Sequence, residues 1–315
     1  MWIFLRKAVR LSAIYLYGAT GEIITEKSGH LNLGTPGIMC MGAIGGCLGV
    51  RAYVGSLSSL SQMNGFAVVL IGIICAFLFG MLGGLIYSFL TVTLRCNQNV
   101  TGLTLTTFGA GLMSFVLSDI DQTGFSEASE YFRMGFVNGQ DLDWFSTLFL
   151  NYGTLVYLAI IVAIAAAVII KRTRVGLNLR AVGENPATAD AAGISVSKYR
   201  YFATLIGAGI AGLGGLCYIM DSLLGTIDYE VEAFGWIAVA LVIFSIWKPN
   251  WAILGSLLFG ILLNAANTIQ ILNKGLIKTL PYVVTVIVLV ITSIINKRET
   301  QPPAALGTSY FREER

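Results

Sequence analysis

The sequence predicts an all-α integral membrane protein that crosses the bilayer several times. Of its 315 residues, 56% are hydrophobic and only 12% are charged, and the mean hydropathy is +0.76. Soluble domains carry about twice that charged fraction. Apolar runs of roughly 18 or more residues recur along the chain, each long enough to cross a hydrocarbon core of about 30 Å. Runs such as YVVTVIVLVITSII do not alternate in polarity, which argues against a membrane β-barrel.

About nine membrane spans are predicted, within a range of roughly eight to ten. They cover residues 3–24, 34–54, 66–90, 102–118, 151–170, 201–220, 234–247, 251–271 and 280–296. The apolar pattern is weakest in the first and the seventh of them. Small residues repeat at four-residue spacing within several spans, as in Gly207, Ala211 and Gly215. These repeats predict closely packed helices, because small side chains let two backbones approach each other.

The charge distribution between the spans predicts the orientation of a single transmembrane domain over residues 1–315. Residues 171–200 hold six lysines and arginines and residues 297–315 hold four, so both segments are expected to face the cytoplasm. Residues 119–150 hold six acids and one basic residue and are expected to form an extracytoplasmic loop. The side of the N-terminus stays open. Nine spans would place it outside, whereas three basic residues among the first ten favour the cytoplasm.

The composition and the motif content exclude several classes of function. A net charge of +3 is too small to indicate nucleic-acid binding. The five cysteines include no CxxC pair and lie mostly in apolar surroundings, which is typical of buried thiols without a chemical role. The sequence holds no GxxxxGK[ST], HExxH or GxSxG motif and a single histidine. We therefore expect no enzyme activity, no metal site and no cofactor held by this chain.

A polar stretch, GEIITEKSGHLNLGTPGIM, joins the first two predicted spans. Ionisable and amide side chains at membrane depth are costly and often functional. The glycines and Pro36 disfavour a regular helix, so one prediction is a broken or re-entrant segment near 26–37. In that case Glu22, Glu26 and Asn32 would line a translocation path. The alternative is a cytoplasmic hairpin loop.

Two further polar groups are candidates for the same path. Asn97 and Asn99 stand at a helix junction, and Thr104 belongs to a run of threonines at three-residue spacing on the next span. Threonines in membrane helices commonly bond to their own backbone, so a structural role and a hydroxyl-lined pore face both remain open. Asn264 and Asn267, three residues apart on the eighth span, form the third group.

The long polar connection RVGLNLRAVGENPATADAAGISVSKYR carries its own helix signals. Asn185 suits the position that caps a helix, Pro186 suits the first helical residue, and Gly193 suits the stop. Between them lies ATADAA, whose small side chains would let a short helix sit deep in a groove on a partner. The alternative is a structured loop with no partner.

Three stretches carry a resemblance to a known family. They are EKSGHLNLGTPGIMCMGA at 26–43, TLRCNQNVTG at 93–102 and RVGLNLRAVGENPATADAAGISVSKYRYFA at 174–203, the last followed by GAGIAGLGG. In their order and spacing they resemble the permease subunits of bacterial ABC importers of the branched-chain amino acid, ribose and nucleoside type. Within that family the chain looks most like the shorter of the two permeases of nucleoside importers.

The resemblance implies a multi-pass permease of the bacterial cytoplasmic membrane that translocates nucleosides. It implies three partners: a separate ATPase that binds the ATP, a second paralogous permease in a heterodimer, and an extracytoplasmic substrate-binding lipoprotein. It also assigns the segment 171–200 to coupling with the ATPase. The residues of this sequence at the coupling positions are Gly183, Glu184, Asn185, Pro186, Ala187, Ala191 and Gly193.

Other functions remain as alternatives. A permease for simple sugars or branched-chain amino acids would show the same motifs. A self-contained, ion-coupled secondary transporter would show paired broken helices in two halves, and only the segment 26–37 is a good candidate. A purely structural membrane subunit would have little use for polar residues at membrane depth.

Overall fold

The computed structural model describes residues 2–135, 143–268 and 301–311, together with 279, 283–288, 290, 291 and 294; the side chains of residues 147, 266 and 267 are not included. Of the ninth predicted span, 280–296, residues 283–288, 290, 291 and 294 are described and the others lie outside the described residues. So do residues 297–300 and 312–315 of the predicted tail.

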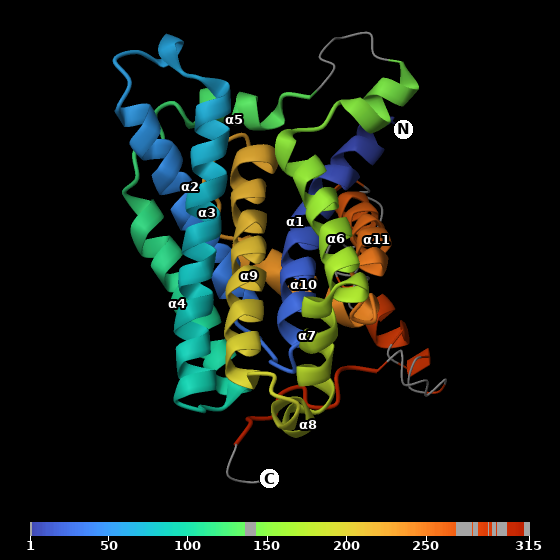
Figure 1. Ribbon diagram of the computed structural model, residues 1–315. Coiled ribbons are helices and arrows are strands. Elements are labelled where there is room, and N and C mark those ends of the chain that lie inside the picture. The colour runs from blue at the N-terminus through green and yellow to red at the C-terminus, as the bar shows by residue number, and fades with distance from the viewer. Residues whose placement is uncertain are drawn as a thin grey trace.

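All regular structure in the described ranges is helical (Figure 1), as the sequence predicts. The helices are α1 (Trp2–Glu26), α2 (Thr35–Gly55), α3 (Gly65–Ser88), α4 (Gln98–Ser118), α5 (Phe125–Arg133), α6 (Thr154–Arg172), α7 (Arg174–Glu184), α8 (Pro186–Ala191), α9 (Val196–Leu216), α10 (Val231–Phe244) and α11 (Pro249–Thr268). Short turns of 3₁₀- or π-helix complete the set: η1 (Leu60–Gln62), η2 (Phe89–Thr93), η3 (Ser146–Leu150) and η4 (Cys217–Ser222).

Five helices in the described part of the chain are long and apolar enough to cross a membrane. They are α2, α3 with η2, α4, α6, and α9 with η4, and each coincides with a predicted span to within a few residues. Helices α10 and α11 are apolar but shorter. Helix α1 has 25 residues and carries charges near both of its ends. The fold class is therefore confirmed, and the total of about nine spans stays a prediction.

Helix α1 runs the full length of the bundle (Figure 1). At its start the Trp2 ring lies 6.4 Å from the ring of Trp144, which belongs to the predicted extracytoplasmic loop at 119–150. At its other end the chain turns beside α7, where a Cβ atom on Gly29 would lie 3.2 Å from Cα of Gly183. The first residues thus lie at the end opposite to α7 and α8, as a nine-span topology requires. One of the three basic residues of this segment, Arg10, has an opposite charge nearby, because its Nε lies 4.0 Å from the buried Asp221 carboxylate.

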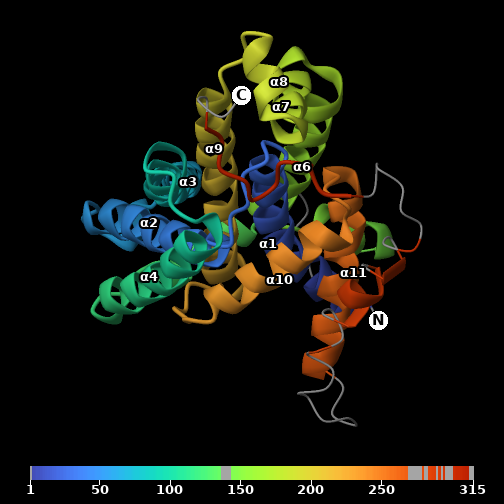
Figure 2. The same cartoon turned by 90° about the horizontal axis from the view of Figure 1, so that it is seen from below.

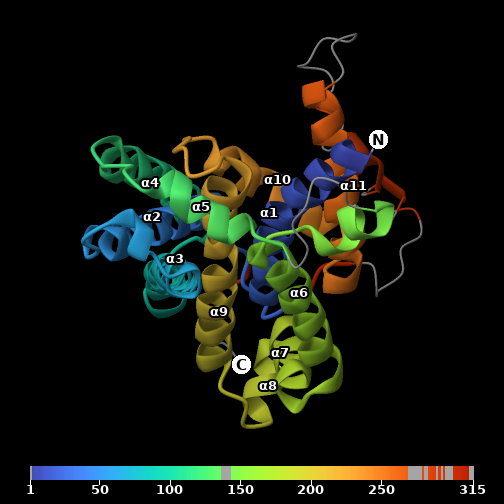
Figure 3. The same cartoon turned by 90° about the horizontal axis from the view of Figure 1, so that it is seen from above.

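Helix α9 stands at the centre of the bundle, with α1, α2 and α3 packed around it (Figures 2 and 3). These helices meet through glycines, as the small-residue repeats predict. A Cβ atom on Gly42 of α2 would lie 2.2 Å from the Gly212 carbonyl oxygen of α9. One on Gly21 of α1 would lie 2.2 Å from the Gly207 carbonyl oxygen. No side chain fits at either crossing, so the two backbones touch.

Helix α10 is a partial span. Its 14 residues reach about 21 Å at 1.5 Å per residue, less than a hydrocarbon core of about 30 Å. It begins near the middle of α1, where the Phe234 ring stacks on Tyr15 with the ring centroids 5.6 Å apart. Just after its end, Trp247 reaches Glu26 at the last turn of α1. The seventh predicted span, 234–247, is therefore a short helix that starts inside the bundle.

Candidate functional site

The polar stretch between the first two spans forms a buried, non-helical connection. Helix α1 ends at Glu26 and α2 begins at Thr35, with Pro36 within the first turn, where a proline costs no hydrogen bond. Most of the connection, residues 27–34, is buried, and His30 and Asn32 are at most 1% exposed. The connection is thus a non-helical segment enclosed by protein.

Neighbouring helices supply hydrogen bonds to the backbone of this connection. The Leu31 amide donates to Oε1 of Gln98 at 2.8 Å, and the Leu31 carbonyl accepts from the Tyr87 hydroxyl. The Asn32 amide donates to Oε1 of Glu22 at 3.1 Å. Non-helical backbone at membrane depth is tolerated only where its polar groups are satisfied in this way.

The second half of the connection is held in the same manner. The Thr106 hydroxyl on α4 donates to the Leu33 carbonyl at 2.9 Å. The Gly34 amide donates to Oδ1 of Asn32 at 3.0 Å, and Nδ2 of Asn32 donates to the Thr35 hydroxyl at 3.5 Å. Asn32 therefore uses its side chain to shape the turn into α2.

Two buried carboxyl groups lie one helical turn apart on α1. Glu22 is 1% exposed and Glu26 is 4% exposed. The second oxygen of Glu22 accepts from the Thr35 hydroxyl, and Oε2 of Glu26 accepts from the Trp247 indole N–H. The pair thus joins α1 to the start of α2 and to the segment after α10.

His30 is fully engaged in hydrogen bonds within the bundle. Its Nε2 lies 2.8 Å from the Thr91 hydroxyl, which donates its own hydrogen to the Tyr87 carbonyl, so Nε2 must be the protonated donor. Its Nδ1, 2.9 Å from the Thr204 hydroxyl, is then the acceptor. Both ring nitrogens are occupied. Within the described residues no group of three His, Cys, Asp or Glu side chains could hold a metal ion.

The predicted residues of the 93–107 stretch lie on a different surface. Asn97 caps α4 and accepts from the Val100 amide at 3.1 Å, while Asn99 and Thr104 are exposed. The Thr104 hydroxyl donates to the carbonyl of Val100 on its own helix at 2.8 Å. The side chains therefore satisfy local backbone groups and also give an outer face of α4 some polar character.

The third predicted group is separate again. Nδ2 of Asn264, on α11, donates to the Phe4 carbonyl near the start of α1 at 2.8 Å. The side chain of Asn267 falls outside the described residues. The seven predicted path residues whose side chains are described therefore do not converge: Glu22, Glu26 and Asn32 come together, Asn97, Asn99 and Thr104 cap or belong to α4, and Asn264 joins α11 to α1. Their assignment to a translocation path stays a prediction.

The buried polar cluster consists of Glu22, Glu26, the 27–34 connection that carries Asn32, and their hydrogen-bond partners. Several of these partners are not marked by any pattern in the sequence. Tyr87 and Trp247 stand alone in apolar runs, and nothing in their spacing marks them as partners of the 27–34 connection. Buried tyrosine and tryptophan do find hydrogen-bond partners as a rule, but the rule does not name the partner. Only the fold brings them to residues about 56 and 221 positions away in sequence.

The predicted coupling segment forms the short helix that its capping residues indicate. Asn185 Oδ1 accepts from the Thr188 amide at 3.0 Å, and Pro186 begins α8. Gly193 has a φ of +83° with open space around it, so its backbone conformation alone requires glycine. Ala187 and Ala191 are exposed. The outer face of α8 is therefore small-sided and accessible.

The predicted coupling segment touches the buried connection directly. A Cβ atom on Gly183, the penultimate residue of α7, would lie 2.3 Å from the Lys27 carbonyl oxygen. Gly29, which has a φ of +77°, packs on the same point. A movement of α7 and α8 would therefore act at once on the segment that carries Asn32.

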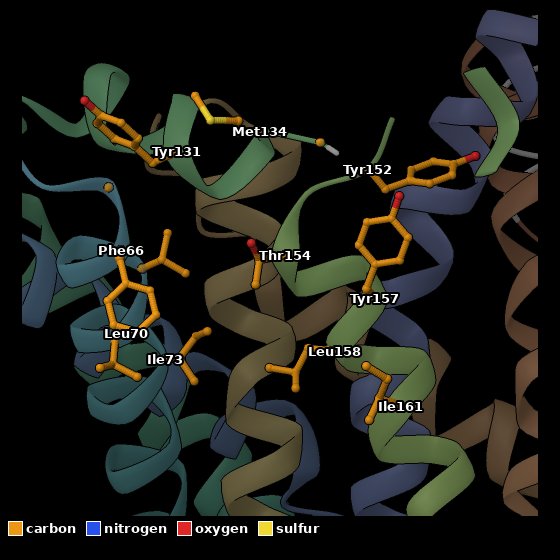
Figure 4. A pocket seen from close by; sticks show the side chains of 13 residues that line it. Phe66, Leu70, Ile73, Tyr131, Met134, Tyr152, Thr154, Tyr157, Leu158 and Ile161 are labelled. Atoms are coloured by element: carbon orange, nitrogen blue, oxygen red, sulfur yellow. The ribbon is translucent and has the colours of Figure 1, made fainter. Parts of the chain in front are cut away.

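A cavity of about 860 Å³ lies between α3 and α6, beneath α5 (Figure 4). Its walls are apolar, with Phe66 and Ile73 from α3 facing Leu158 and Ile161 from α6. Tyrosines gather near its mouth at the α5 end. The lining contains none of the eight residues predicted for a path.

The fold resembles that of a known transporter. The chain matches a solved structure described as a metal-chelate type ABC transporter in an inward-facing conformation. The TM-score is 0.50, and the match covers 92% of this chain and 85% of the other at 13% sequence identity. At that identity the likeness concerns the fold alone.

Proteins of known family resemble the chain over nearly its whole length. A protein named as a glucose ABC transporter permease of Haloferax volcanii is 32% identical, with 98% of this chain and 97% of that protein covered. The nucleoside ABC transporter permease NupC of Lactococcus lactis is 30% identical, with 95% and 93% covered. The guanosine ABC transporter permease NupQ of Bacillus subtilis is 29% identical, with 94% and 92% covered.

The chain also matches a protein family over most of its length. Residues 4–293 match the family described as the permease component of the branched-chain amino acid transport system. This range includes α1, with its buried carboxyl pair, and the capped helix α8. The chain therefore belongs to this family of ABC transporter permeases.

Proposed function

We propose that this permease moves nucleosides into the cell and takes its energy from a separate ATPase subunit. The chain is a membrane subunit of an ABC importer rather than a catalytic enzyme, as its family and fold indicate. Two of its relatives are named for nucleosides or guanosine, which supports the substrate class. The membrane would be the cytoplasmic membrane of a bacterium, as the sequence resemblance implies.

The observation that carries the proposal is the exposed face of α8. Ala187 and Ala191 are exposed on a helix whose opposite side is fixed by the buried Ala189. Small side chains on a capped, protruding helix suit insertion into a groove of a partner, which we take to be the ATPase. Since Gly183 packs against Gly29, docking of the ATPase on α8 would also act on the buried connection at residues 27–34.

The outer face of α4 suits a second permease subunit. Thr104 and Thr107 are exposed there beside Leu103 and Phe108. Hydroxyls among apolar side chains are typical of surfaces that meet another membrane helix or a water-filled path. In our proposal this face lies between two paralogous permeases, and a substrate-binding lipoprotein delivers nucleoside at the end that carries α5.

Purification of the tagged chain from its native membrane tests the proposal. An ATPase and a second permease should co-purify with it. Vesicles that contain the complex should take up labelled nucleoside, and excess unlabelled nucleoside should compete with this uptake. Recovery of the chain alone, with uptake driven by an ion gradient, would favour a secondary transporter instead.

A sugar importer is the second candidate. The 32% identity to a protein named as a glucose permease favours it. The same vesicles separate the two: excess unlabelled glucose should leave nucleoside uptake unchanged, whereas excess guanosine should abolish it. Uptake of labelled glucose that excess glucose abolishes and excess guanosine leaves unchanged would assign the chain to sugars.

A further inference from the structure

Residues 301–311 form a strap across the end of the bundle that carries α7 and α8 (Figures 1 and 2). The strap has no helix or strand of its own. It reaches five different parts of the fold through the contacts described next. Neither the predicted path nor the predicted coupling residues include it.

The first half of the strap binds the point where the coupling segment meets the buried connection. The Ala305 amide donates to the Gly183 carbonyl at 3.0 Å. Two residues later, the Gly307 amide donates to the Gly29 carbonyl at 3.3 Å. The strap therefore bridges the two glycines whose backbones already lie in contact.

The Thr308 carbonyl receives hydrogen bonds from two helices. Arg200 of α9 donates through Nη1 at 3.0 Å, and Gln98 of α4 donates through Nε2 at 3.4 Å. Arg200 is only 3% exposed, and its Nε and Nη2 atoms have no hydrogen-bond partner among the described residues. A buried guanidinium is costly without an acceptor, so the strap carbonyl holds α9 in place here.

The last part of the strap grips α8 itself. The Tyr310 hydroxyl donates to Oδ2 of Asp190 at 2.9 Å. The Tyr310 side chain also packs on a small apolar cluster made by Val182, Ala189 and Val196. A helix of six residues is marginal by itself, so these contacts fix where α8 stands relative to the bundle.

We propose that the strap is a positioning element of energy coupling, with Tyr310 and Arg200 as its two anchoring side chains. It ties α8, α7 and the 27–34 connection into one mechanical unit. A displacement of α8 by the ATPase is then transmitted to the buried polar cluster and is not lost in the loop. This inference rests on the proposed function, since it assigns a role within that coupling.

The test compares docking with coupling in the assembled complex. Tyr310→Phe removes one hydroxyl and keeps the ring, and Tyr157→Phe makes the same change at the far end, where that hydroxyl donates to the Phe149 carbonyl at 2.9 Å. A second pair of variants ends the chain before Gln301 or before Arg312. Each complex is assayed in vesicles for bound ATPase and for ATP hydrolysed per nucleoside transported.

Tyr310→Phe and the chain that lacks the strap should keep the ATPase but hydrolyse more ATP per nucleoside. The rise should be on the order of tenfold for Tyr310→Phe, since a hydrogen bond to a carboxylate contributes about 1.5 kcal/mol or more. Tyr157→Phe and the chain ending before Arg312 should match the wild type.

Two results would overturn the strap's role. One is a wild-type ratio of hydrolysis to transport in both Tyr310→Phe and the chain without the strap. The other is loss of the ATPase from both, because the strap would then serve docking alone. A wild-type complex that moves no nucleoside would instead refute the proposed function and is recognised before any variant is compared.

Discussion

Gly183, at the end of α7, packs directly against Gly29 in the connection between α1 and α2, with Cα of the first 3.2 Å from where a Cβ atom of the second would lie. This contact joins the segment that the sequence predicts to face the cytoplasm with the buried polar cluster around Asn32. In the proposed function, this contact accounts for the long polar segment at 174–200, which interrupts an otherwise apolar chain. In our proposal that segment positions α8, as a docking helix, against the buried connection at residues 27–34.

Gly183→Val should reduce uptake strongly. A Cβ atom there would stand 2.3 Å from the Lys27 carbonyl oxygen, so the backbone of the connection must shift. Overpacking of this kind costs about 1–3 kcal/mol. Uptake and the midpoint of thermal unfolding measure the effect. Gly55→Val is the matched control, because a Cβ atom on Gly55, at the end of α2, meets nothing within 4 Å. Normal uptake by Gly183→Val would show that the contact transmits nothing.

Ala187→Arg and Ala191→Arg should prevent recovery of the ATPase with the permease. Both residues are exposed in the isolated chain, so the variants should fold and insert. In a partner's groove the added charge would be buried and unpaired, at a cost of several kcal/mol. That weakens an interface by about a hundredfold or more. Ser126→Arg at the exposed start of α5 serves as the control for charge alone. Full ATPase recovery with both alanine variants would remove α8 from the interface.

Gly193→Val should impair coupling, whereas Gly193→Asn should be tolerated better. At a φ of +83° a β-branched residue is strained, and asparagine adopts the left-handed region more readily. Space is not the cause, since a Cβ atom on Gly193 would meet nothing within 4 Å. Uptake by the two variants at equal membrane levels measures the difference. Equal uptake by both would mean that this turn does not need its observed backbone conformation.

Asn32→Leu should lower both uptake and stability, and Asn97→Leu should do less harm. The first change orphans the buried Gly34 amide, which costs about 1–3 kcal/mol. The second removes only the cap of α4, worth about 1 kcal/mol. Thermal unfolding in detergent, read beside uptake, ranks the two. Should Asn97→Leu prove the more damaging, the α4 surface rather than the buried cluster would dominate transport.

A cysteine at Ser126 should react with an impermeant thiol reagent from outside, and one at Ser195 only from the cytoplasm. Both positions are exposed, and they lie beside α5 and α9 at opposite ends of the bundle. The exposed Cys96 must first be replaced by serine so that the background is silent. Labelling of Ser195→Cys from outside would invert the orientation.

The sequence predicts the helices because membrane spans and caps are local signals. Asn185, Pro186 and Gly193 mark α8 without any tertiary information, and the structure places that helix at Pro186–Ala191. The polar cluster is different. Glu22 and Asn32 could be singled out by their cost in an apolar setting, but their bonding to one another and to Thr35 depends on how α1 and α2 pack. Pairing across such distances leaves no periodic trace in the chain.

The seventh predicted span shows the same limit. The window 234–247 is apolar enough to suggest a crossing, yet α10 ends at Phe244 and starts beside Tyr15, partway along α1. Hydropathy reports how apolar a segment is, and not the depth in the bundle at which the segment begins. The strap at 301–311 is not predictable from the sequence either, because its contacts are mostly made by backbone atoms.

The central claim is that this permease imports nucleosides with energy from an ATPase docked on α8. Vesicles that contain the purified complex, with the binding lipoprotein outside, test it most directly when loaded with or without ATP. The account predicts accumulation of labelled guanosine only with internal ATP, and none with Ala187→Arg. Accumulation that needs no ATP and follows an imposed proton or sodium gradient would contradict it.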